Sequence, residues 1–143
     1  MKLTGLIAVV ALVALVSTIT MGADMTGSAK KQLQTAQTHA GFAAGYDTIA
    51  EVELHLHHVA NCLEGPSGKN FHAASKNVCE GSGIFQDLKD SSMPGAHALP
   101  YAEIADQVAL WGIQQTMAKD IGRAKAAATA AKSILQQAQD NFK

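Results

Sequence analysis

The chain has 143 residues, and 11 Lys and Arg stand against 12 Asp and Glu, which gives a net charge of −1 at pH 7. A chain so balanced, with no basic run, offers no electrostatic attraction for nucleic acid, and we predict no nucleic-acid partner. Its length is enough for one domain with a modest core.

The first segment, residues 1–23, has the layout of a secretory signal peptide. Lys2 precedes an almost wholly apolar run over residues 3–16, and small and polar residues follow. The run is shorter than the roughly 20 residues of a membrane-spanning helix. We therefore expect a periplasmic or secreted protein with a single mature domain over residues 24–143. An uncleaved N-terminal anchor is the alternative.

The next residues predict a helical hairpin. Apolar residues recur at helical spacing over residues 29–44, and a glycine-containing turn leads to a second helix expected over residues 48–64. Thr48 followed by Glu51 has the form of a capping box, which marks a helix start. Gly65, followed by proline, marks the end of this second helix.

Residues 65–100 contain turn sequences and no long apolar period, so we predict a crossover loop that is functional or held in place. In an exported protein two cysteines most simply form one disulfide, Cys62 to Cys79. Metal binding or disulfide exchange by the thiols is the alternative. The bridge would fold the loop, with Phe71 and His72, back over the second helix. The loop is also a candidate surface for a protein partner.

The last third of the chain predicts a second hairpin. Pro100 opens a helix over residues 101–118 with two apolar sides, and Trp111 is expected to anchor the core. An alanine-rich stripe over residues 120–142 indicates a fourth helix that packs closely. The predicted fold class is all-α, a four-helix bundle of two antiparallel hairpins joined by the long, disulfide-pinned crossover loop.

The second helix carries a polar face beside its core stripe, formed by Glu51, His55, His58 and Cys62. His39 lies eight residues before Asp47 in the hairpin turn and His55 eight residues after it, so both should lie at the same height. The side chains of the two helices either converge between them or diverge, and the sequence leaves both arrangements open.

Converging side chains would form a metal site. His39, His55 and His58 would supply imidazole donors, and Glu51 or His72 would complete the shell. Imidazole suits copper, zinc, nickel and iron, and we expect copper or zinc. The alternative is that these histidines are solvated or bound to backbone groups. His97, in a loop rich in turn residues, is expected to be solvated.

The stretch THAGFAAGYDTIAEVELHLHH, with a histidine on each side of a turn, resembles the small histidine-rich metal-binding proteins of bacterial periplasms. Those proteins are helical bundles that bind divalent metals, copper especially. They are shorter, carry histidines on all their helices and lack a disulfide-bearing loop. The resemblance covers the first hairpin and implies metal binding, with His39, His55 and His58 as the positions that correspond.

These features predict an exported protein that binds copper or zinc for buffering or delivery. A haem-binding electron-transfer subunit is one alternative, although a covalent CxxCH site is absent. A structural or interaction module that binds a partner through its loop, or a second copy of itself, is the other. We expect no enzyme, because the chain has no recognisable serine, histidine and acid arrangement and no glycine-rich phosphate loop.

Overall fold

The computed structural model describes residues 28–89 and 95–143 of the chain. These residues form a helix over 28–45, α2 (Ile49–Glu64), a short α3 (Ile84–Asp87), α4 (Leu99–Met117) and α5 (Ile121–Asp140), with 3₁₀ turns η1 (Ala73–Ser75) and η2 (Ala96–Ala98). No strand occurs in this part of the chain, so the predicted all-α class is confirmed. The expected signal peptide, residues 1–23, lies outside the described residues.

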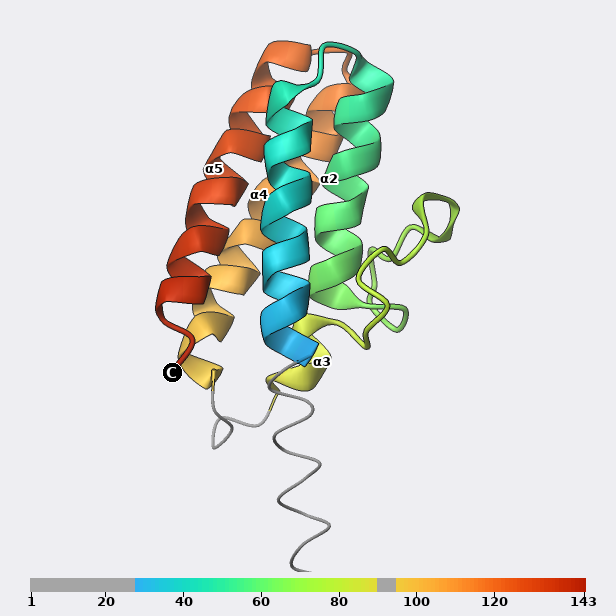
Figure 1. Cartoon of the computed structure of the whole chain (residues 1–143). Helices are drawn as coiled ribbons and strands as arrows, with labels where there is room; N and C mark the ends of the chain where they lie inside the picture. Colours follow the sequence, from blue (N-terminus) through green and yellow to red (C-terminus); the bar gives the residue numbers. More distant parts are fainter. Residues whose placement is uncertain (1–27, 90–94) are drawn as a thin grey trace, which may run out of the picture.

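The four long helices lie side by side, with the first helix and α2 joined by a short turn at one end and α4 and α5 joined at the same end (Figure 1). Hydrogen bonds from Gln37 to Gln136 (2.7 Å) and from Gln139 to Gln37 (2.8 Å) tie the first helix to α5. Alanine dominates the buried positions: Ala36, Ala40, Ala43, Ala105, Ala109, Ala124, Ala128, Ala131 and Ala138. Small side chains allow close helix approach.

Helix α2 begins and ends where the sequence predicts. Thr48 is its N-cap, because the Glu51 backbone N–H donates to the Thr48 hydroxyl oxygen at 3.3 Å and the hydroxyl donates to the Glu51 carboxylate at 2.6 Å. Its C-cap is Gly65, whose φ of 70° favours glycine and whose N–H donates to the Asn61 carbonyl at 2.9 Å. The cap residues thus set the length of the helix that carries the histidines.

Residues of the crossover loop pack against the long helices. Cys62 and Cys79 form the predicted disulfide, with their Cα atoms 5.3 Å apart. Ile84 and Leu88, in and next to α3, are fully buried in the core. A Cβ atom on Gly65 would lie 1.8 Å from the Ser82 carbonyl oxygen, so the returning chain packs directly against the end of α2.

The predicted role of Trp111 is wrong. Its side chain is 45% exposed on α4, and Ile104 on the same side of the helix is 51% exposed. The core face of α4 is instead built from small residues such as Ala105, Ala109 and Gly112. Close packing of α4 against α2 and α5 through small residues leaves no room on that face for an indole ring.

None of the described helices is long and apolar enough to cross a membrane. The Cys62–Cys79 disulfide is consistent with an oxidising compartment, where such bonds persist.

Candidate metal centre

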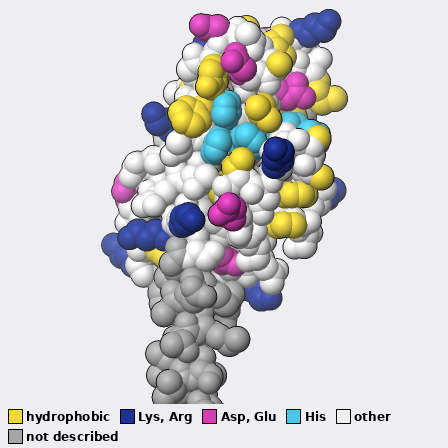
Figure 2. All heavy atoms as spheres, turned by 45° about the vertical axis from the view of Figure 1, so that its right-hand side comes forward, with side chains coloured by type: hydrophobic (Ala, Val, Ile, Leu, Met, Phe, Trp, Pro, Cys, Tyr) yellow, Lys and Arg dark blue, Asp and Glu magenta, His cyan; other side chains and the backbone are white. Residues whose placement is uncertain are grey.

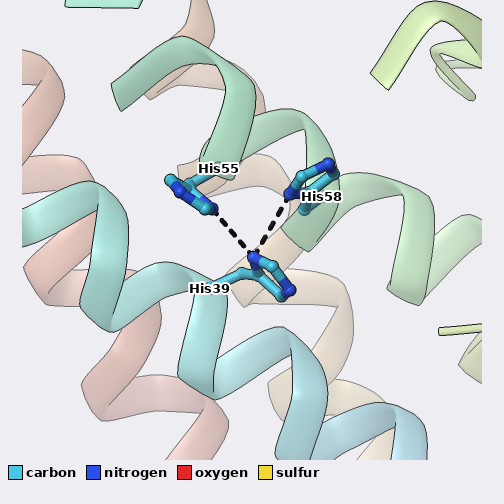
Figure 3. Close-up of side chains that lie close together, drawn as sticks. All are labelled: His39, His55 and His58. Carbon is cyan, nitrogen blue, oxygen red and sulfur yellow. Dashed lines mark hydrogen bonds between the residues drawn. The ribbon is translucent and has the colours of Figure 1, made fainter. Parts of the chain in front are cut away.

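Three histidines from two helices point at one another (Figure 3). His39 Nδ1 lies 2.8 Å from His55 Nδ1 and 3.2 Å from His58 Nδ1. One nitrogen of each ring can be chosen so that all three lie within 4.8 Å of one another. The structure therefore has the converging arrangement of the two that the sequence left open.

The core stripes of the two helices bring these rings together. His39 precedes the buried Ala40, and His55 precedes the buried Leu56, so each histidine lies at the edge of its apolar stripe. Burial of those stripes against the rest of the core turns both edges toward each other. His58 is one turn beyond His55 on α2, which places it on the same side of the helix.

The loop sets the orientation of the His58 ring. His58 is 7% exposed, and its Nε2–H donates to the backbone carbonyl of Ser75 at 2.7 Å. A neutral imidazole carries one N–H, so a proton on Nε2 leaves the Nδ1 lone pair directed at His39 Nδ1, 3.2 Å away. Metal-binding histidines commonly make such a hydrogen bond through their other nitrogen.

Asn61 holds this part of the loop on α2. The Asn61 side chain is fully buried, its amide donates to the carbonyls of His72 (3.0 Å) and Lys76 (2.7 Å), and its carbonyl oxygen accepts from the His72 N–H (2.8 Å). These bonds flank Ser75 on both sides. Sequence reasoning missed both Asn61 and Ser75. The one available signal was an amide next to Cys62, on the face where the loop was expected.

Aromatic side chains border the three rings. Phe42 meets His39 edge to face, with ring centroids 5.6 Å apart at 87°, and Tyr46 stacks on His55 at 5.1 Å and 2°. Phe42 is 46% exposed and Tyr46 39% exposed. Histidine atoms reach the molecular surface among hydrophobic side chains (Figure 2). The group is therefore reachable from solvent but has an apolar border.

All three histidines favour the neutral form. Burial lowers the pKa of His39 to about 4, with repulsion from protonated His58 and His55 acting in the same direction. Burial, then His58, lowers the pKa of His55, against an opposing effect of Glu51. Burial also lowers the pKa of His58, although its bond to Ser75 opposes this. Neutral imidazole is the form that binds metal, so few protons have to be displaced at pH 7.

The structure places the other predicted ligands outside this group. The carboxylate of Glu51 accepts a hydrogen bond from Thr48. The Nδ1 atom of His72 is hydrogen-bonded to the Ser75 hydroxyl at 2.7 Å, and its ring stacks on His57 with centroids 4.0 Å apart. His97 is exposed in η2, as expected of a solvated residue.

The distances from the His39 Nδ1 atom to the other two Nδ1 atoms suit a small ion. On a tetrahedral zinc ion with Zn–N bonds of 2.0–2.1 Å, two nitrogens lie about 3.3 Å apart. The Nδ1 atoms of His55 and His58 lie 2.8 and 3.2 Å from that of His39, so slight separation of the rings makes room for the ion. Both cysteines are in the disulfide, which excludes thiolate ligands.

No protein-family model, curated protein or solved structure with which the chain was compared matches it. The function is therefore inferred from the site itself.

Proposed function

We propose that this protein binds one transition-metal ion, copper or zinc, through His39, His55 and His58. The observation that carries the proposal is the convergence of three imidazole nitrogens from two helices within 4.8 Å. The Nδ1 atom of His39 faces the Nδ1 atoms of both His55 and His58, and one N–H cannot satisfy all three nitrogens, so a lone pair is left without a donor in the absence of an ion. A metal ion relieves this by accepting all three.

A bare ion suits this geometry better than haem. Two axial histidines of a haem lie on opposite faces of the porphyrin, with the macrocycle between their rings. Here His39 Nδ1 and His55 Nδ1 are 2.8 Å apart, and the rings of Phe42 and Tyr46 border the site. Insertion of a porphyrin would require the hairpin to open.

The proposed role is metal buffering or delivery by an exported four-helix bundle. Histidine atoms at the molecular surface allow the ion to enter and leave, which a fully enclosed structural site would prevent (Figure 2). The proposed export agrees with the disulfide. The resemblance of the first hairpin to histidine-rich periplasmic metal-binding proteins points to the same class of function.

The test is metal content by mass spectrometry of protein purified without chelator or affinity tag, followed by thermal melting with added copper or zinc. Ligand at a hundredfold excess over its Kd should stabilise the fold by about 2.7 kcal/mol. We expect one ion per chain and a clear rise in Tm.

A His39→Ala, His55→Ala variant should lose the rise in Tm, whereas the matched control His97→Ala should keep it, because His97 is exposed and distant in the sequence from the group. Absence of a metal-dependent rise in the unaltered protein would overturn the proposal. An equal rise in all three proteins would place the metal elsewhere.

A further inference from the structure

The three histidines leave a bound ion short of ligands. Zinc and cobalt take at least four donors in proteins, and sites with three protein ligands keep a position for solvent or substrate. The described residues contribute His39, His55 and His58 to the group and no fourth His, Cys, Asp or Glu. The donor at the remaining coordination position must therefore be another residue near the site or a ligand from solvent.

The nearest candidate donors on this chain have other partners. The Glu51 carboxylate accepts a hydrogen bond from the Thr48 hydroxyl at the helix N-cap. His72 is hydrogen-bonded to Ser75 and stacked on His57. Cys62 and Cys79 are joined in the disulfide. Recruiting any of these would require loss of a helix cap, a loop contact or a covalent bond.

Solvent, by contrast, has access. His39 and His55 are both partly exposed, and histidine atoms form part of the molecular surface (Figure 2). The neighbouring Phe42 and Tyr46 are also substantially exposed. The partly exposed His39 and His55 and the exposed aromatic side chains beside them leave the group in contact with solvent.

The charge of the ligand set favours an anion. All three protein ligands are neutral imidazoles, so a divalent ion keeps its full charge in a partly buried site. We infer, on the basis of the proposed function, that the bound ion has one coordination position open to solvent, which takes water or a small anion. The protein is then a carrier whose metal can be reached by an incoming ligand, as ligand exchange during metal delivery requires.

Cobalt(II) and azide provide the test. The full-length protein is loaded with one equivalent of cobalt(II), loading is verified by mass spectrometry, and the visible absorption spectrum is followed while sodium azide is added at constant pH and ionic strength. We expect a saturable spectral change with an isosbestic point, because azide replaces water on the ion. Cobalt(II) with His39→Ala protein is the control and should lack the starting spectrum.

The outcomes separate the two proposals. Failure of cobalt(II), copper and zinc to bind would overturn the proposed function and this inference together. Stoichiometric cobalt binding with a spectrum that azide leaves unchanged would overturn the open position alone and leave metal binding intact. A second readout is the relaxation rate of water protons in the copper(II) protein, which should fall on addition of azide if a bound water is displaced.

Discussion

The two helix pairs of this protein have similar backbones and different chemistry. The first helix and α2 carry histidines at the edges of their core stripes and hold a disulfide-bonded loop. Helices α4 and α5 contain no histidine and pack through alanine and glycine. The difference indicates that one pair is a packed support, while the other, placed against it, holds the site.

The close packing of α4 against α5 and α2 is clearest at Gly112. A Cβ atom there would lie 2.9 Å from the Ala127 Cβ and 3.0 Å from a Leu56 methyl group. Three helices therefore meet at this glycine. Leu56 lies next to His55, so packing at Gly112 also determines how far α2 can approach its neighbours.

The largest expected effect is on pH dependence where the two pairs meet. Asp106 on α4 is buried against Glu64 at the end of α2, and its Oδ1 atom has no hydrogen-bond partner among the residues that the structure describes. Glu64 accepts hydrogen bonds from the backbone and side-chain amides of Asn70 at 2.7 and 2.6 Å. Glu64 and Lys69 both line a groove at the end of α2. Burial, then Glu64, raises the pKa of Asp106 to about 7.

The folded protein thus holds a proton that the unfolded chain releases near pH 4. Between about pH 4 and pH 7 the folded state binds more protons, so this group lowers stability as pH rises, by at most about 4 kcal/mol. Asp106→Asn should remove this contribution and flatten the profile above pH 4. Urea unfolding of the unaltered protein and of Asp106→Asn at pH 4.5, 6 and 8 measures how the free energy of unfolding of each changes with pH. Since the lowered histidine pKa values act in the opposite direction below pH 6.5, the difference between the proteins is the relevant quantity. If the difference in the free energy of unfolding between the two proteins is the same at all three pH values, the pKa of Asp106 is not raised as we infer.

The second prediction concerns the loop on the histidine-bearing helix pair. Cys62→Ser with Cys79→Ser removes a bridge across 17 residues, and we expect a loss of about 3 kcal/mol in the free energy of unfolding. Metal affinity should also fall, about tenfold or more, because the loop that carries the Ser75 carbonyl is then held on α2 by the Asn61 hydrogen bonds without the covalent bridge. Urea unfolding and metal titration at 15 °C measure the two effects. Retained affinity would show that the loop does not orient the ring.

The third prediction separates the support from the site. Gly112→Leu places a large side chain between α4, α5 and α2, and we expect a loss of about 1–3 kcal/mol through overpacking. Metal affinity of the folded variant should change less than in the disulfide variant, since Gly112 meets Ala127 and Leu56 rather than a ligand or the Ser75 carbonyl that orients His58. The same two measurements compare the variants directly. A larger loss of affinity than of stability would mean that the two pairs are more tightly coupled than we infer.

The fourth prediction concerns Asn61, where we expect a smaller loss of metal affinity than in the disulfide variant. Asn61→Ala removes three hydrogen bonds to the loop but leaves the disulfide in place. We expect a stability loss of about 1–3 kcal/mol and a drop of a few fold in metal affinity. The matched control Asn77→Ala removes loop hydrogen bonds that do not involve α2, to Gly81 and Cys79, and should leave metal affinity unchanged. Equal affinities in the two variants would argue against a role for Asn61.

The sequence alone determined the helices and their ends, because these depend on local interactions. Periodicity predicted the long helices within two residues at each end, and Thr48 and Gly65 marked the ends of α2 through hydrogen bonds that span a few residues. The disulfide followed from there being two cysteines in a chain expected to be exported. The candidate ligands followed from helical spacing and from their distance to the turn.

Tertiary structure decided every feature that depends on which face of a helix is buried against its neighbours. Whether His39 and His55 converge is a matter of rotation of the hairpin against α4 and α5, which no local pattern contains. Trp111 is exposed because small residues allow α4 to pack by another face. The Ser75 carbonyl reaches His58 only because Asn61 and the disulfide bring a loop back across 17 residues. Contacts between residues distant in the chain are set by the packing of the whole core, and they turn separate histidines into a candidate site.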